Sequence, residues 1–165
     1  MTPIPHHEGY FCVVDLGIDA LVVYRQDACG KLNRLYSIPI PAGQGPRHVA
    51  YTSTGQAYLV TELGNRIYPV HFEKDRGTVE GVGVSTLQND CTKNTAAALW
   101  VSADDHFVWV SNRGEGTIAG YSLPNLKRCA AYTMLGKEPR DFCLLENNLI
   151  VTACQDAGLT ILRNG

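Results

Sequence analysis

The sequence VTELG, residues 60–64, recurs in related form three more times: as VVDLG at residues 13–17, as VSNRG at residues 110–114 and as VTACQ at residues 151–155. Aligned on these letters, the third residues of the four copies are Asp15, Glu62, Asn112 and Ala153, spaced by 47, 50 and 41 residues. Such a spacing is typical of β-propeller blades, in which each repeat is a small sheet that stacks on its neighbours. The repeat therefore predicts a propeller.

A second alternating strand is expected after each copy, at residues 20–25, 66–72, 117–122 and 158–162. A third follows at residues 34–40, 78–86 and 128–134. GPRH at residues 45–48 and EPRD at residues 138–141 begin the second and fourth copies. Short alternating runs separated by Gly, Asn and Asp turns indicate an all-β chain, and no helical periodicity is present.

The expected repeat units are residues 9–41, 46–86, 96–134 and 140–162, which hold three, four, four and three strands. The first blade is expected to lack its innermost strand and the fourth its outermost. With about 45 residues per blade, the chain supplies roughly three and a half four-stranded blades, about half of a seven-bladed ring. We expect one partial propeller domain, which needs a homo-oligomer or the missing half of the propeller to cover its open faces.

Composition indicates a soluble globular protein, with 45% hydrophobic residues, 18% charged residues and a formal net charge of −2. No apolar run approaches the roughly 18 residues of a membrane span. No basic cluster favours nucleic acid as a partner. The N-terminal sequence MTPIPHHEGY has neither a basic start nor an apolar stretch. We therefore expect no nucleic-acid or membrane partner and a cytoplasmic location.

The chain has six cysteines, none in a C-x-x-C pair: Cys12, Cys29, Cys91, Cys129, Cys143 and Cys154. Their irregular spacing favours small buried thiols in a reducing compartment over a metal or disulfide framework. The adjacent His6 and His7 suit a surface turn better than one metal ion. We expect neither a metal site nor a cofactor.

Two further groups of residues favour structural roles. Trp100 and Trp109 fall at alternating strand positions, which favours packing between blades over ligand stacking. The acidic sequence Asp104-Asp105 before His106 resembles a metal cluster, but a solvated turn between two strands explains it better.

The stretch GPRHVAYTSTGQAYLVTELGN, residues 45–65, resembles the lactonase family of seven-bladed β-propellers. This family contains the propeller-type 6-phosphogluconolactonases and the fungal carboxymuconate lactonizing enzymes. The resemblance continues in VVDLGIDALVVYRQDACGKL at residues 13–32, VSNRGEGTIAGY at residues 110–121, and EPRDF with CQDAGLTIL at residues 138–142 and 154–162. It covers nearly the whole chain.

The resemblance implies a site at one end of the central channel, built from a histidine, arginines and a glutamate. The matching motifs carry these roles onto Arg47 and His48 in GPRH, Glu62 in VTELG and Arg113 in VSNRG. The EPRD motif adds Arg140, followed by Asp141, to the substrate-binding candidates. The implied partner is a small anionic lactone or sugar acid, with 6-phosphogluconolactone as the expected substrate.

Lactone hydrolysis requires a base that activates water and cations that stabilise the oxyanion. Glu62 is the candidate base, and His48 can exchange a proton near neutral pH. The guanidinium groups of Arg47 and Arg113 can bind a phosphate or carboxylate and stabilise the oxyanion. This scheme requires no metal.

Structural roles remain open for the same residues. Arg47 and Arg140 occupy equivalent places in two repeats and could tie blades together, Arg113 could cap a turn, and Glu62 could close one. Two other functions also remain open. One is a non-catalytic propeller segment that binds a small anion or another protein chain, and the other is cycloisomerisation of a muconate-like diacid.

Overall fold

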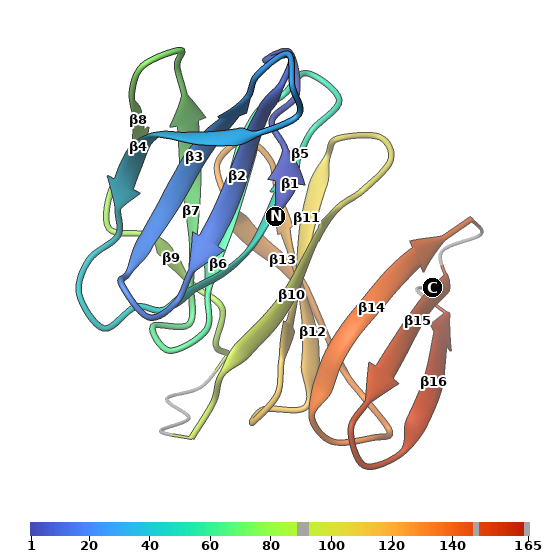
Figure 1. The fold of residues 1–165 in the computed structure, drawn as a ribbon. Coiled ribbons are helices and arrows are strands. Elements are labelled where there is room, and N and C mark those ends of the chain that lie inside the picture. Colours follow the sequence, from blue (N-terminus) through green and yellow to red (C-terminus); the bar gives the residue numbers. More distant parts are fainter. Residues whose placement is uncertain (89–92, 147–148, 164–165) are drawn as a thin grey trace.

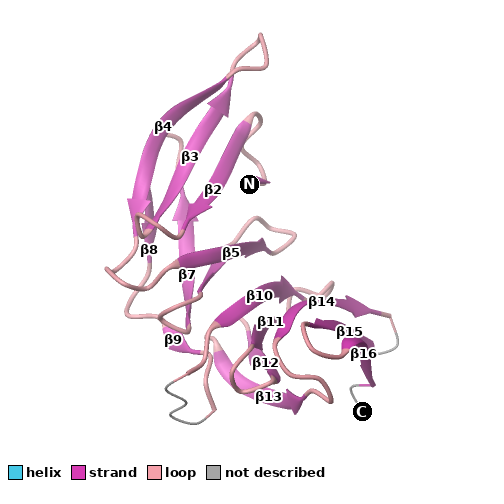
Figure 2. Cartoon of the chain, turned by 60° about the horizontal axis from the view of Figure 1, so that its bottom comes forward, coloured by secondary structure: helices cyan, strands magenta, loops and turns pink. Residues whose placement is uncertain are grey.

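In the computed structural model, residues 1–88, 93–146 and 149–163 are described. They form antiparallel sheets that follow one another side by side in chain order, as Figures 1 and 2 show from two directions. None of these residues is in an α-helix. The predicted fold class, an all-β partial propeller, is confirmed, and each sheet is called a blade below.

Blade 1 has the strand order β1-β2-β3-β4. Its strands are β1 (Thr2–Pro3), β2 (Tyr10–Asp15), β3 (Ala20–Gln26) and β4 (Leu32–Pro39). Blade 2 has the order β5-β6-β7-β8, and a further short strand, β9, also pairs with β7. Its strands are β5 (Pro46–Tyr51), β6 (Ala57–Thr61), β7 (Arg66–Phe72), β8 (Gly77–Val79) and β9 (Val84–Ser85).

Blade 3 has the order β10-β11-β12-β13, and blade 4 has the order β14-β15-β16. The strands of blade 3 are β10 (Ala96–Val101), β11 (Phe107–Asn112), β12 (Thr117–Ser122) and β13 (Lys127–Thr133). Those of blade 4 are β14 (Pro139–Leu145), β15 (Leu149–Cys154) and β16 (Gly158–Arg163). As expected, the described part of blade 4 ends at its third strand.

Two strand predictions were wrong. Blade 1 does have an innermost strand, because Thr2 pairs with Cys12 and Pro3 with Phe11. Two residues are too few to produce an alternating pattern, so this strand left no signal in the sequence. The strand expected at residues 78–86 is divided into β8 and β9, since Gly81 and Gly83 adopt φ values of 65° and 71° that end an extended strand.

Apolar side chains are buried between successive blades. One cluster joins blades 1 and 2 around Leu21 and Leu59, a second joins blades 2 and 3 around Val60 and Leu99, and a third joins blades 3 and 4. All five residues of β6 are buried, because blade 2 has a neighbour on each face. Burial on both faces explains why the central strands are continuously apolar.

The far face of blade 4 has no covering sheet among residues 1–88, 93–146 and 149–163. Leu159 and Ile161 on β16 are therefore 74% and 63% exposed. In the same part of the chain, no helix is long and apolar enough to cross a membrane.

The cysteine prediction is right in part. Cys12 and Cys154 are buried, and burial raises the pKa of the Cys12 thiol to about 12. Cys29, in the turn after β3, and Cys129, on the outer strand β13, are exposed instead. Cys91 lies outside the described residues.

The turns that follow the repeated segments align differently in the structure than in the sequence. Strand pairing closes each turn between Asp15 and Ala20, between Thr61 and Arg66, and between Asn112 and Thr117. The last residue of each turn has a left-handed backbone, with φ values of 48°, 53° and 65°: Asp19, Asn65 and Gly116. By this register Glu62 corresponds to Leu16 and Arg113, not to Asp15 and Asn112.

The sequence alignment followed the glycine that the first three segments share, but this glycine is second in the first and third turns and third in the second. The register of the turns decides which side chains share one end of the propeller. Glu62 and Arg113 open equivalent turns on neighbouring blades, and they therefore lie at the same end of the propeller.

Candidate active site

β-Bulges at the starts of β5 and β14 position two of the candidate arginines. The pairing register shifts between Pro46 and His48, and it shifts again between Pro139 and Asp141. Arg47 and Arg140 are therefore the extra residues of equivalent bulges. Such bulges change the direction of a side chain at the rim of a sheet. The third inner strand has its own shift between Ala96 and Leu99.

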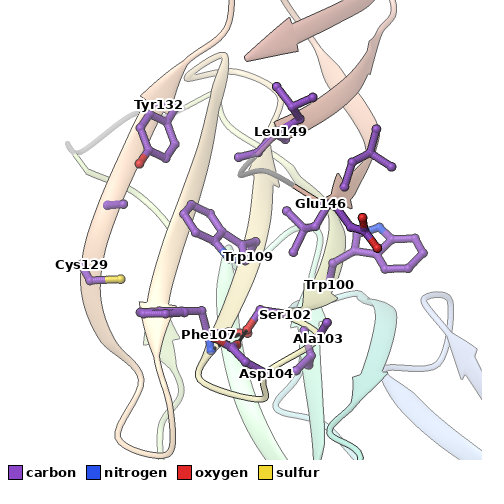
Figure 3. Close-up of a pocket in the computed structure, with 15 residues that line it drawn as sticks. Trp100, Ser102, Ala103, Asp104, Phe107, Trp109, Cys129, Tyr132, Glu146 and Leu149 are labelled. Carbon is purple, nitrogen blue, oxygen red and sulfur yellow. Dashed lines mark hydrogen bonds between the residues drawn. The ribbon is translucent and has the colours of Figure 1, made fainter. Parts of the chain in front are cut away.

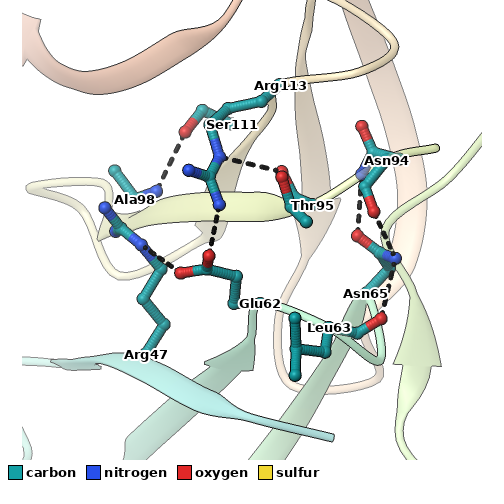
Figure 4. Close-up of polar contacts among 9 residues, drawn as sticks. All are labelled: Arg47, Glu62, Leu63, Asn65, Asn94, Thr95, Ala98, Ser111 and Arg113. Carbon is teal, nitrogen blue, oxygen red and sulfur yellow. Dashed lines mark hydrogen bonds and ion pairs between the residues drawn. The ribbon is translucent and has the colours of Figure 1, made fainter. Parts of the chain in front are cut away.

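Glu62 lies between two arginines from neighbouring blades, as Figure 4 shows. Its Oε2 atom is 3.0 Å from Nε of Arg47, and its Oε1 atom is 2.6 Å from Nη2 of Arg113. The Glu62 side chain is 22% exposed, that of Arg47 is 23% exposed and that of Arg113 is 10% exposed. We call these three residues the Arg-Glu-Arg cluster. It is partly buried and carries a net positive charge.

Arg113 is held in place by Thr95, the residue directly before β10. Its backbone N–H donates to the carbonyl oxygen of Thr95 at 3.0 Å, and its Nε–H donates to the same oxygen at 3.4 Å. Its Nη2 atom is buried and lies 2.6 Å from Oε1 of Glu62. The guanidinium group is thus fixed between a backbone carbonyl oxygen and a carboxylate.

The buried side chain of Asn94 supports the turns that carry the cluster. Its Nδ2 atom donates to Oδ1 of Asn65 at 2.7 Å and to Oδ1 of Asn112 at 3.2 Å. Its Oδ1 atom accepts the backbone N–H of Glu115 at 2.9 Å. Asn94 thereby fixes the Glu62 turn of blade 2 against the Arg113 turn of blade 3 (Figure 4).

Both ion pairs of Glu62 are with arginines. His48 instead contacts β10, the inner strand of blade 3. The Nδ1 atom of His48 accepts the backbone N–H of Leu99 at 3.2 Å, so the neutral ring carries its proton on Nε2. The ring packs edge-on against Trp100, with the centroids 6.4 Å apart. Burial lowers the pKa of His48, and the negative charge of Asp141 opposes this shift in part.

Arg140 and Asp141 lie beside this region but are exposed. Burial lowers the pKa of Arg47 from its ordinary value, while Glu62 opposes the shift. The positive charges of Arg113 and Arg140 lower the pKa of Arg47 further. Asp141 accepts a long hydrogen bond of 3.4 Å from Nε1 of Trp100.

Trp100 is a residue that sequence reasoning assigned to packing between blades. It is 40% exposed on the inner strand of blade 3, between His48 and Asp141. The available signal was its place near the end of the predicted inner strand of blade 3, two residues after a run of three alanines, Ala96 to Ala98.

The structure therefore sorts the predicted residues into two adjacent groups. Arg47, Glu62 and Arg113 form the ion-paired cluster at the rim, and His48 lies with Trp100 and Asp141 on its other side. Arg140 is exposed, and its positive charge acts on the neighbouring Arg47. In the described residues, no three His, Cys, Asp or Glu side chains converge in a way that could hold a metal ion.

The turn containing Asp104 and His106 is solvated, as expected. Nδ1 of His106 lies 3.2 Å from Oδ2 of Asp104. The His106 side chain is 76% exposed and that of Asp104 is 54% exposed. Such an exposed pair contributes little to stability.

Comparison with known proteins agrees with this architecture. The chain is 34% identical over 145 residues to the 6-phosphogluconolactonase of Bacillus subtilis, which covers 84% of this chain and 41% of that protein. A solved structure from Lactobacillus plantarum matches with a TM-score of 0.86 at 32% identity, over 94% of this chain and 48% of the other.

The periplasmic gluconolactonase of Pseudomonas aeruginosa matches with a TM-score of 0.89 at 25% identity, over 99% of this chain and 49% of the other. The chain thus spans about half the length of the relatives that it matches. The family model described as "Lactonase, 7-bladed beta-propeller" matches residues 1–162. The chain therefore belongs to the family of seven-bladed β-propeller lactonases.

Proposed function

We propose that this chain contributes the anion-binding part of a lactonase site and that its substrate is a phosphorylated or carboxylated sugar lactone, 6-phosphogluconolactone. The observation that carries the proposal is the Arg-Glu-Arg cluster, in which one carboxylate lies within 3.0 Å of two guanidinium groups from neighbouring blades. The name of the Bacillus subtilis relative supports the choice of substrate.

The two arginines have different parts in substrate binding. Arg113 is nine-tenths buried and held by Thr95 and Glu62, so it is a fixed positive charge beside the site. Arg47 is more exposed and can turn from Glu62 toward an incoming anion. A phosphate or carboxylate accepts two parallel hydrogen bonds from a guanidinium group, which fixes its orientation.

In the proposed reaction, water adds to the lactone carbonyl carbon and gives its proton to the Glu62 carboxylate as the new C–O bond forms. The carbonyl oxygen gains negative charge, which the neighbouring arginines stabilise. The C–O bond to the ring oxygen then breaks, and this oxygen takes up a proton. The protonated Glu62 carboxyl can return its proton to that oxygen, which restores the carboxylate, while the neutral His48 ring, whose Nδ1 atom is already an acceptor, can donate a hydrogen bond from Nε2–H to the same oxygen.

One observation favours a non-catalytic role for the isolated chain. Both oxygens of Glu62 already face an arginine, so the carboxylate is paired before any substrate arrives. A propeller segment of this kind would bind a small anion or another chain without turnover. The remaining blades, supplied by a second copy or by the other half of the ring, are the partner proposed for activity.

Turnover of 6-phosphogluconolactone separates the two functions. We expect the assembled protein to hydrolyse this lactone, and we expect Glu62→Gln and His48→Ala to lose the rate while they keep the β-sheet circular dichroism spectrum. Glu73→Gln is the control, because Glu73 pairs with Arg76 on an exposed turn of the same blade. Absence of turnover in the unsubstituted protein in every assembly state would favour the binding function.

A further inference from the structure

Two features outside the Arg-Glu-Arg cluster lie on either side of it. One is a mainly apolar cavity of about 770 Å³ between blades 3 and 4, shown in Figure 3, whose lining includes Trp100 and Trp109 but none of the cluster residues. The other is a set of polar contacts at the boundary between blades 1 and 2. Only these contacts lead to the cluster.

Asp19, the last residue of the turn between β2 and β3, reaches from blade 1 to the loop that leads into blade 2. The backbone N–H of Gly43 donates to its Oδ2 atom and that of Gly45 donates to its Oδ1 atom, each at 2.7 Å. These hydrogen bonds hold the pKa of Asp19 below its ordinary value, and the one from Gly45 has the larger effect. Both oxygens of a charged carboxylate are thus used by one loop.

The loop at residues 43–45 supports both partners of an ion pair in the cluster. The carbonyl oxygen of Gly45 accepts the backbone N–H of Glu62 at 2.7 Å, and that of Gln44 accepts two further N–H groups of the same turn, at 3.1 and 2.9 Å. Arg47 follows Gly45 by two residues, at the bulge that begins β5. A shift of this loop would therefore move Arg47 and the Glu62 turn together.

The next blade boundary has a counterpart of Asp19. Asn65 ends the turn of blade 2, and its side chain exchanges two hydrogen bonds with Asn94, in the loop that leads into blade 3, at 2.7 and 3.1 Å. At the boundary between blades 3 and 4 the turn ends in Gly116, which has no side chain, and the bulge arginine Arg140 is exposed. Side-chain support of the next loop thus occurs at the two boundaries that carry the cluster.

We propose that Asp19 is a positioning residue for the candidate active site: its carboxylate fixes the loop at residues 43–45, and this loop sets the places of Arg47 and Glu62. Asp19 acts through the backbone of the loop, because N–H groups already use both of its oxygens. This role rests on the proposed function, since the geometry that it maintains is that of the lactone site. Blade 1 thereby contributes to a site whose three charged side chains belong to blades 2 and 3.

Two variants at this position suit the left-handed backbone of the turn. Asp19→Asn keeps the size of the side chain but has one acceptor oxygen, so its NH₂ group faces the second N–H donor. Asp19→Gly removes the side chain, as at Gly116. Asp27→Asn is the matched control, because Oδ1 of Asp27 also accepts two backbone N–H groups, from Cys29 and Lys31, each at 3.0 Å, in the turn after β3 of the same blade.

The first readout is two-dimensional NMR of the chain without ligand. We expect both Asp19 variants to shift the Nε–H signal of Arg47 and to speed hydrogen exchange at the Glu62 amide, because the loop that holds them loses its support. The control variant Asp27→Asn should leave both unchanged. The second readout is turnover of 6-phosphogluconolactone by the assembled protein, in which kcat should fall about tenfold or more in the Asp19 variants and stay at the parent value in the control.

An unchanged Arg47 signal in both Asp19 variants would overturn the proposal. Equal changes in Asp27→Asn would also overturn it, because blade 1 would then affect the site only through its stability. Absence of turnover in the unsubstituted assembled protein would instead contradict the proposed function, and the Arg47 signal would still decide the role of Asp19.

Discussion

Replacement of Glu62 by glutamine removes one charge that two arginines share. The ion pairs span 2.6 and 3.0 Å and involve side chains that are 10 to 23% exposed. Exposed pairs contribute about 0–1 kcal/mol, and loss of one partner of a buried pair costs about 3–5 kcal/mol. The cluster lies between these limits, so we expect Glu62→Gln to lower the free energy of unfolding by about 2 kcal/mol.

At about 2–4 °C per kcal/mol for a chain of this size, the thermal midpoint should fall by roughly 4–8 °C. A double-mutant cycle with Arg113→Gln isolates the interaction. The double variant has no unpaired Arg113 charge. Its loss of unfolding free energy should therefore be smaller than the sum of the losses in the two single variants, by about 1–2 kcal/mol. Circular dichroism melts of the four proteins give these values.

Glu73→Gln provides the matched control, because its ion pair with Arg76 is exposed on the same blade, and we expect no change in the midpoint. Additive effects of Glu62→Gln and Arg113→Gln, with a coupling below about 0.3 kcal/mol, would refute the reasoning. The two side chains would then be neighbours without an energetic interaction.

Three further results are expected. Burial lowers the pKa of His48 in the folded chain, so its contribution to stability is present above the ordinary histidine pKa and is lost as the pH falls. In thermal melts between pH 7 and pH 5, the His48→Asn variant should therefore lose less stability than the parent protein. Leu59→Ala, at a fully buried position, should cost about 2–5 kcal/mol in urea unfolding, whereas Leu135→Ala should cost under about 0.5 kcal/mol. Alkylation at pH 8, mapped by mass spectrometry, should modify the exposed Cys29 and spare Cys12 until the chain unfolds.

The fold was predictable because the repeat is strong at several places at once. The segment VTELG and its three relatives mark the end of the same strand in each blade, and alternation marks the strands on either side. Burial against neighbouring sheets imposes this pattern, most strongly on blades 2 and 3, which have a sheet on each face. The strand β1 could not be predicted because it has only two residues, too few for a period to be recognised.

The sequence motifs named three residues that the structure brings together, but not the geometry that joins them. The motifs named Arg47, Glu62 and Arg113, which the structure brings together. The alignment placed Glu62 opposite Asn112 instead of Arg113, because a one-residue shift of glycine inside a four-residue turn is invisible without strand pairing. Contacts between blades depend on that register.

The most direct test of the Arg-Glu-Arg cluster as an anion site is a titration of the chain with 6-phosphogluconate, the product of the proposed reaction. Two-dimensional NMR of the arginine Nε–H groups would follow it, with Arg47→Gln and Arg113→Gln used to assign the signals. We predict saturable shifts of the Arg47 and Arg113 signals, whereas the Arg76 signal should stay in place. Shifts of all arginines alike, or none at millimolar ligand, would contradict an anion site at the blade rim.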